Sequence, residues 1–278
     1  MINIGEYNEL EVVKQMDFGI YLREGDVEIL MPTKWVPKGT KIGDTLTVFI
    51  FRDSDDRLIA TTVDPYVTAN TFAFLEVKQV NNIGAFLDWG MDKDLLVPFR
   101  EQPMRMEPGK NYVVFVYVDE ITNRLVASAK LNKYIERENI SIQESDIVDL
   151  LIYSETDLGF NAIINNKYSG LIYKNEIYEA IRVGDKIQGF VKRVREDNKI
   201  DISLQKSGYE LVDDVKWRIL KLMKEENGFL LLNDNSSPED IKAKLQISKK
   251  AFKKAVGALY KERLVKLTDK GVELVIQH

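Results

Sequence analysis

The sequence predicts a mostly β protein with an α+β module at its C-terminal end: three tandem five-stranded barrels, then three helices and a hairpin. Three observations predict this. Four landmarks recur three times at nearly fixed spacing before residue 206. The recurring segments are rich in Val, Ile, Phe and Tyr and are bounded by Gly, Asp and Asn. Helical spacing of apolar residues begins only near residue 209.

The first landmark is a glycine inside an apolar run, at Gly19, Gly84 and Gly159, so that the units are offset by 65 and 75 residues. The second is an apolar strand whose last residue falls 13, 14 and 14 positions after that glycine. These strands end at Pro32, Pro98 and Tyr173. The constant offsets indicate that each unit keeps the same strand register.

The third landmark is a turn glycine 24, 25 and 25 positions after the first glycine, followed by a long β-prone run. The fourth is a basic residue 38, 40 and 40 positions after it, which opens a short alternating strand. About five strands in about 65 residues are too few for a two-sheet sandwich but fit a five-stranded Greek-key barrel. Closing the sheet also removes exposed strand edges.

The C-terminal segment changes to helical patterning. Apolar residues from Leu211 to Met223 predict an amphipathic helix that ends at Asn227-Gly228, and a short strand is predicted over 229–232. Ser237 before Pro238 predicts a second helix, and Ser248 a third that runs to about Leu264. Residues 265–268 and 272–276 predict a hairpin.

These patterns divide the chain into predicted domains at 1–66, 67–131, 147–206 and 207–278, with a polar linker at 132–146. The linker pattern fits either a rigid helix or a flexible tether. The choice matters because it sets whether the surfaces on its two sides act together.

The landmarks carry a family resemblance. The order Phe-Gly-x-aromatic, apolar strand, Gly-Asp before a β-run and Arg-Leu-x-x-Ser resembles the S-one (S1) RNA-binding domain, which has the OB fold. The clearest middle is Ser169 to Glu176, followed by Val183-Gly184-Asp185. Three helices and a hairpin resemble a winged helix. Three S-one units followed by a winged helix resemble the conserved virulence factor B (CvfB/YitL) family of bacteria.

Composition argues against an enzyme. The chain of 278 residues has no cysteine, and its single histidine is the terminal His278. The residues that thiolate catalysis, disulfides and the usual zinc sites require are therefore missing. We predict no catalytic residue, no metal ligand and no cofactor. No apolar run reaches the roughly 20 residues of a membrane helix and no secretory signal opens the chain, so a cytoplasmic location without membrane contact is expected.

Charge is distributed unevenly along the chain. The net charge is −5, residues 1–65 alone carry −5, and only residues 207–278 are basic, at +3. On the third predicted helix Lys249, Lys250, Lys253 and Lys254 form one cationic face, as expected for a helix that enters a nucleic-acid groove. A lysine face that only confers solubility is equally compatible with the pattern. The pattern does not distinguish RNA from DNA.

The resemblance implies that aromatic residues beside the first glycine stack on bases, here Phe18 and Tyr21 in the first unit and Phe86 in the second. Residues 18 and 21 face opposite sides of a regular strand, so both can be exposed only if Gly19 allows a bulge or strong twist. The alternative is that one member of the pair belongs to the core, and for Phe86 the two interpretations are balanced.

In the third unit the flanking positions hold Leu158 and Asn161, which stack poorly. Tyr173 stands where the family often has histidine and is a stacking candidate. The basic residues of this unit would grip phosphate in compensation; they are Lys174, Lys192, Arg193 and Arg195. We therefore expect the third barrel and the winged helix to hold the nucleic acid most tightly.

The sequence favours a non-catalytic binding protein for single-stranded or structured RNA, in post-transcriptional or translation-associated regulation. Two alternatives stay open: a DNA-binding regulator acting through the winged helix, and a protein-interaction scaffold. A nuclease is disfavoured because no stretch is left for a catalytic domain and no acidic cluster has metal-ligand spacing.

Overall fold

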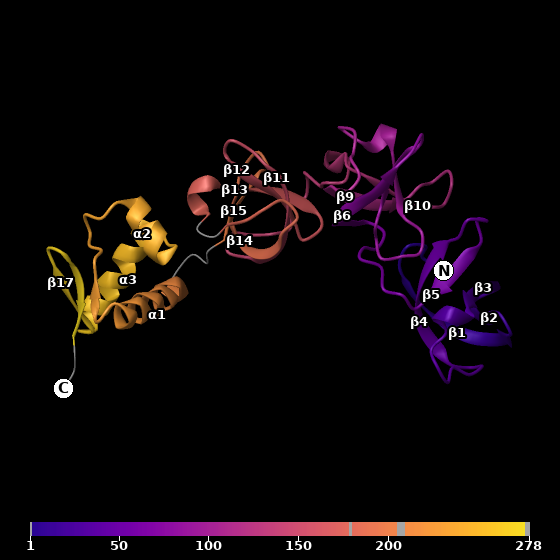
Figure 1. The fold of residues 1–278 in the computed structure, drawn as a ribbon, viewed down its shortest axis with the longest axis horizontal. Coiled ribbons are helices and arrows are strands. Elements are labelled where there is room, and N and C mark those ends of the chain that lie inside the picture. Colours follow the sequence, from indigo (N-terminus) through magenta and orange to yellow (C-terminus); the bar gives the residue numbers. More distant parts are fainter. Residues whose placement is uncertain (1, 178–179, 205–208, 276–278) are drawn as a thin grey trace. The chain divides into compact units, whose positions relative to one another are not determined.

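The structure, a computed structural model, describes residues 2–177, 180–204 and 209–275 (Figure 1). His278 lies outside the described residues. The chain separates into two compact units, Met1–Ile135 and Glu136–His278. The first unit holds two β-barrels, and the second holds a third barrel and the C-terminal module.

Each barrel is built from five strands. Barrel 1 comprises β1 (Tyr7–Met16), β2 (Gly19–Glu24), β3 (Val27–Pro32), β4 (Thr45–Arg52) and β5 (Leu58–Thr61); barrel 2 comprises β6 (Thr71–Val80), β7 (Gly84–Leu87), β8 (Leu95–Pro98), β9 (Asn111–Val118) and β10 (Leu125–Ser128); barrel 3 comprises β11 (Ile147–Glu155), β12 (Gly159–Ile164), β13 (Tyr168–Tyr173), β14 (Lys186–Val194) and β15 (Ile200–Ser203).

All three sheets close in the same order. In barrel 1 the order is β1-β2-β3-β5-β4, with β1 pairing antiparallel to β4 and β3 pairing parallel to β5. Barrels 2 and 3 repeat that order and the parallel pair. A three-residue 3-10 helix follows the third strand of each barrel. The predicted fold of three five-stranded barrels is therefore confirmed.

The repeated glycine is required by close packing of two strands. A Cβ added at Gly19 would lie 2.2 Å from the carbonyl oxygen of Met31, and one at Gly84 would lie 2.2 Å from that of Val97. At Gly159 the same contact would be with a backbone oxygen 1.9 Å away. No side chain fits at these distances, which explains why the glycine recurs at the start of the second strand in every barrel.

The first strand of each barrel carries a β-bulge, and the bulge does not lie at the glycine. In β1 the register shifts between Val12 and Lys14, and β6 and β11 shift at the equivalent places. As a result Lys14 lies opposite Tyr21 across the ladder. The sequence predicted that Phe18 and Tyr21 could both be exposed only with a bulge or strong twist at Gly19. The structure places the bulge on the neighbouring strand β1.

Barrel 1 has a hydrophobic core of its own, which contains Leu10, Leu22 and Ile50, and it contributes to a second core that it shares with barrel 2. Phe49 and Phe51 of β4 pack in the same buried cluster as Trp89, Val97 and the other inward residues of barrel 2. The backbone N–H of Ala69 in barrel 2 donates to the carbonyl of Gly5 at 2.7 Å. The two barrels therefore pack against each other within one compact unit.

The predicted linker forms neither a strand nor an α-helix, and its two ends contact different barrels. Tyr134 stacks on Phe115 of barrel 2 with ring centroids 4.1 Å apart. On the other side of the unit boundary, the Glu136 N–H donates to the carbonyl of Lys167 in barrel 3 at 2.9 Å, and Ile140 packs on the barrel 3 core. Most of the residues between 136 and 146 are exposed. The predicted domain boundaries stay predictions.

The C-terminal module (orange to yellow in Figure 1) has helices on a small sheet. Its elements are α1 (Tyr209–Glu225), β16 (Phe229–Leu230), α2 (Pro238–Leu245), α3 (Lys249–Lys261), β17 (Val265–Thr268) and β18 (Gly271–Leu274). Ser237 and Ser248 accept the capping hydrogen bonds of α2 and α3, as predicted. The strand at β16 and the helix at α3 are each shorter than their patterns indicated.

Candidate nucleic-acid interface

In barrel 1 the two predicted aromatic residues lie together on the surface. Phe18 precedes β2 and is 54% exposed, and its ring meets that of Tyr21 edge to face with centroids 6.4 Å apart. The bulge in β1 brings the Lys14 ammonium to 5.3 Å from the Tyr21 ring. An aromatic pair of this kind can stack on a base while the neighbouring cation contacts its phosphate. The half-buried Tyr21 and exposed Phe18 thus face the same side.

The position of Phe18 is apolar and exposed in all three barrels. Ile83 is 52% exposed and Leu158 is 63% exposed. The carbonyl of each of these residues accepts a hydrogen bond from the N–H that opens the following 3-10 helix, so the three positions have the same local structure. Phe86, which lies on β7 three residues after Ile83, is half-buried. Each barrel therefore presents an apolar contact at the same place on its surface.

In barrel 3 Arg195 is held by its own barrel. Its guanidinium donates to both carboxylate oxygens of Asp201, at 3.0 and 2.7 Å, and to the Tyr173 hydroxyl at 2.5 Å. The hydrogen bond to Asp201 is the main reason that the pKa of Arg195 is raised above its ordinary value, with Tyr173 second. Tyr173 is half-buried, and Arg195 orients its ring rather than standing free for phosphate.

The other basic residues of barrel 3 differ in availability. The Lys192 ammonium lies 2.5 Å from a carboxylate oxygen of Glu176, whose second oxygen accepts from Ser203. Lys174 and Arg193 are exposed, and within the described residues neither makes an ion pair or hydrogen bond through its side chain. Of the four predicted cations, these two are the better placed to meet an incoming phosphate.

The lysines of α3 form the basic face that the sequence predicts. Lys250, Lys253 and Lys254 are exposed and Lys249 is partly exposed, while Phe252 on the opposite side is fully buried. Lys253 lies 3.4 Å from Asp234; the other three make no side-chain ion pair within the described part of the chain. Whether they touch nucleic acid stays a prediction.

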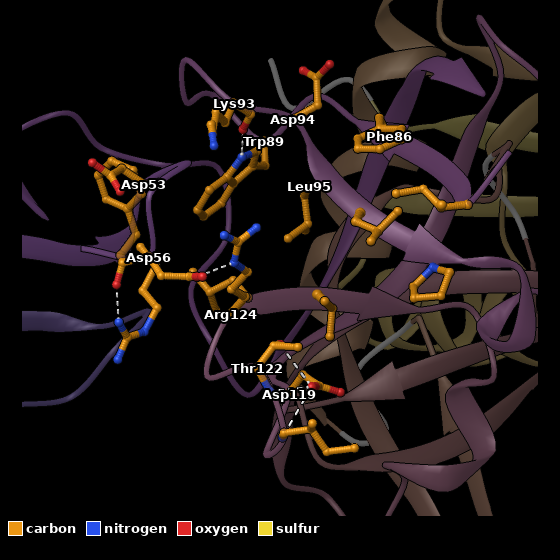
Figure 2. A pocket seen from close by; sticks show the side chains of 18 of the residues that line it. Asp53, Asp56, Phe86, Trp89, Lys93, Asp94, Leu95, Asp119, Thr122 and Arg124 are labelled. Atoms are coloured by element: carbon orange, nitrogen blue, oxygen red, sulfur yellow. Dashed lines mark hydrogen bonds and ion pairs between the residues drawn. The ribbon is translucent and has the colours of Figure 1, made fainter. Parts of the chain in front are cut away.

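A pocket at the junction of barrels 1 and 2 was not predicted. It measures about 1150 Å³ and is called here the composite pocket (Figure 2). The end of β4 and the following turn contribute four residues, Phe51, Arg52, Asp53 and Asp56, and barrel 2 supplies the rest. Phe86 lines it, so the stacking residue predicted for barrel 2 opens into this pocket. The repeat pattern describes one barrel at a time, so it cannot predict a pocket that two barrels form together.

Ion pairs and backbone bonds fix the walls of the composite pocket. The Nε of Arg124 donates to the Asp56 carboxylate at 2.6 Å, as Figure 2 shows. That hydrogen bond is the main reason that the pKa of Asp56 lies below its ordinary value. The indole N–H of Trp89 donates to the Lys93 carbonyl. Burial, followed by the charge of Asp88, raises the pKa of Asp94.

Comparison with known families agrees with this architecture. Residues 4–63 and 71–130 match the S1 domain, and residues 217–274 match the CvfB-like winged helix domain. Tandem S1 domains followed by a winged helix define a nucleic-acid-binding protein. The chain therefore contains S1 domains and a CvfB-like winged helix domain, and it is similar to proteins of the conserved virulence factor B family, as its sequence pattern indicated.

Individual relatives cover most of the chain. The protein YitL of Bacillus subtilis (strain 168) is 29% identical over 265 residues, which are 92% of this chain and 89% of that protein. Conserved virulence factor B of Staphylococcus aureus (strain N315) is 24% identical over 241 residues, covering 84% and 80%. A crystal structure of a Streptococcus pneumoniae TIGR4 multidomain protein with nucleic acid binding domains is 24% identical, covers 98% of both chains and gives a TM-score of 0.43.

Within the described residues, no helix combines the length and apolar character that crossing a membrane requires.

Proposed function

We propose that this protein binds single-stranded or structured RNA without catalysing a reaction on it, in the cytoplasm, and that it acts in post-transcriptional or translation-associated regulation. The observation that carries the proposal is the repeated exposed apolar residue at Phe18, Ile83 and Leu158. Single strands offer unstacked bases that such surfaces can cover, whereas duplex DNA keeps its bases stacked.

The winged helix provides the electrostatic contribution to RNA binding. Three α3 lysines without a described partner would neutralise phosphates and release counterions, which makes binding salt-dependent. Lys174 and Arg193 would do the same on barrel 3. The aromatic and apolar positions of barrels 1 and 2 would then add contacts to bases.

A titration of equal-length single-stranded RNA, hairpin RNA and duplex DNA at two salt concentrations tests the proposal. The full chain is compared with K249A/K250A/K254A and with K38A/K41A, which removes exposed lysines of barrel 1. We expect RNA to bind tighter than duplex DNA. Loss of three phosphate contacts should lower the slope of log K against log salt by about 2 for a single strand, and the barrel 1 control should leave it unchanged.

The cationic α3 favours one rival function, a regulator that binds duplex DNA by inserting this helix in the major groove. Tighter binding to duplex DNA, lost in the α3 variant, would establish that function in place of ours. Binding to none of the three nucleic acids would leave a protein-interaction scaffold.

A further inference from the structure

We propose that the outer face of α1 is a second contact surface for single-stranded RNA, on which Trp217 stacks against an unpaired base while the cations beside it contact phosphates. The helix is the orange one in Figure 1, and it lies outside the barrels and apart from the lysines of α3. The inference rests on the proposed function and deepens it, because it gives the winged helix a contact with bases as well as with phosphates.

Trp217 breaks the amphipathic pattern of α1. The buried side of the helix holds Val215, Ile219 and Met223, which pack in the core of the module. Trp217 lies on the opposite side and is 63% exposed, and within the described residues its indole N–H has no hydrogen-bond partner. Tryptophan is enriched among the anchor residues of binding interfaces. An exposed indole that contributes little to the core therefore indicates contact with a ligand.

Basic side chains accompany the ring along the same face. Lys221, one turn further along, places its ammonium 5.3 Å from the centre of the Trp217 ring. Arg218 and Lys224 are also exposed, and none of these three cations makes an ion pair in the part of the chain that the structure describes. The described part of this face carries one carboxylate against them, Glu225. A nucleotide strand matches such a face, because its bases stack on aromatic rings and its phosphates meet the cations.

The outer face of α1 is distinct from the lysine face of α3. Phe252 and Leu259 on the buried side of α3 belong to the same core as Ile219 of α1, so both helices turn their charged sides away from that core. Lys216, the neighbour of Trp217, links the two helices through an ion pair of 2.6 Å with Glu262, directly after α3. The two basic faces are therefore separate surfaces of one small module.

A single strand fits this face better than a duplex or a peptide. Paired bases stack on each other, so a duplex offers the Trp217 ring no free base. An acidic peptide would complement the same cations, but the S1 domains and the winged helix are nucleic-acid-binding modules. A single strand accounts for the α1 face and for the exposed apolar positions of the barrels together. Trp217 would then make the winged helix favour single strands over duplexes.

Fluorine NMR of the full chain labelled with fluorotryptophan follows this contact directly. The chain has three tryptophans, and the Trp217 signal is the one that disappears in W217F. Two strands of equal length are titrated: ordinary single-stranded RNA, and an abasic strand with the same number of phosphates. We expect the ordinary strand to shift the Trp217 signal and the abasic strand to shift it much less, because stacking requires the base.

Variants at Trp217 measure what the ring contributes to affinity. W217L removes the ring but keeps apolar bulk, and loss of one stacked base should raise the Kd for ordinary RNA about 5- to 150-fold. W217F keeps a smaller ring and should retain part of the affinity. L231A removes an exposed apolar side chain elsewhere in the module and, as the matched control, should bind as the parent does.

A second pair of variants measures the cations. K221A/K224A should lower the salt dependence of RNA binding by about two phosphate contacts. K38A/K41A removes the same number of exposed lysines from barrel 1 and should leave the salt dependence unchanged.

The outcomes separate this inference from the function on which it rests. If ordinary RNA binds the full chain but neither shifts the Trp217 signal nor loses affinity in W217L, the inference fails and the proposed function stands. If the abasic strand shifts the signal as far as ordinary RNA does, the face binds phosphate without stacking a base, and the inference is overturned. If no strand binds, the proposed function fails with it, and an acidic protein partner becomes the better ligand for this face.

Discussion

The ring of Phe49 in barrel 1 meets the ring of Trp89 in barrel 2 edge to face, with centroids 5.9 Å apart. Phe49 is fully buried and Trp89 is 4% exposed, so this contact lies in the shared core. A polar link, Asp56 to Arg124, crosses the same junction near the surface. Buried aromatic packing outweighs an exposed ion pair, so the apolar contact should hold the barrels together.

We therefore predict that Trp89→Ala destabilises the first unit by about 3–5 kcal/mol, whereas Arg124→Ala leaves its unfolding midpoint nearly unchanged. Urea unfolding followed by circular dichroism measures both. Should Arg124→Ala prove the more damaging change, the ion pair and not the core would be the main connection.

A second prediction concerns glycines that look alike in sequence. Gly84→Ala would place a methyl group 2.2 Å from a backbone oxygen, and overpacking of this kind costs about 1–3 kcal/mol. Gly257 lies in α3 with nothing within 4 Å of an added Cβ. Gly257→Ala should stabilise the winged helix by up to about 1 kcal/mol, because alanine is the better helix former. Thermal unfolding of the two variants should shift in opposite directions.

The repeated glycines illustrate what the sequence could predict. A strand crossing that excludes every side chain imposes the same residue at the same place in each barrel, so Gly19, Gly84 and Gly159 mark the repeat and fix the fold. The helix starts of the winged helix could be predicted in the same way, because Ser237 and Ser248 cap α2 and α3 as their residue types indicate.

The shared core and the composite pocket could not be predicted in this way. Phe49 and Phe51 alternate with their neighbours as any barrel strand does, and nothing local says that their partner is the next barrel. Likewise, Arg195 and Lys192 look available in sequence, but tertiary pairing with Asp201 and Glu176 engages both.

A third prediction concerns acid stability. Burial alone would raise the pKa of Glu101, but the hydrogen bonds from Ser128 and Lys133 outweigh it and hold that pKa below its ordinary value of 4.5. The ionised form therefore stabilises the fold above the unfolded-state pKa, and this contribution is lost as the pH falls through the lower folded-state value.

We expect Glu101→Gln to cost about 1–3 kcal/mol at pH 7, the worth of hydrogen bonds to a charged group. Between about pH 5 and pH 3 its stability should fall less steeply than that of the parent chain. Denaturant unfolding over that range measures both slopes, and Glu120→Gln, at an exposed carboxylate of the same barrel, serves as the control. Parallel pH curves for parent and Glu101→Gln would contradict the assignment.

The last prediction distinguishes the roles of two neighbouring arginines: Arg193 lies in β14, and Arg195 directly follows the end of that strand. Arg193 is exposed without a described partner, whereas Arg195 is tied to Asp201 and Tyr173. Arg193→Ala should weaken RNA binding and lower its salt dependence by about one phosphate contact, without changing the unfolding midpoint. Arg195→Ala should do the reverse, because it leaves the partly buried Asp201 carboxylate without its cation while removing no available charge. Affinity at two salt concentrations and thermal unfolding, measured on both variants, give four numbers. Arg195→Ala could instead lower the RNA affinity and its salt dependence while leaving the unfolding midpoint unchanged. In that case Arg195 leaves its intramolecular partners to bind RNA, and the assignment of the two roles is reversed.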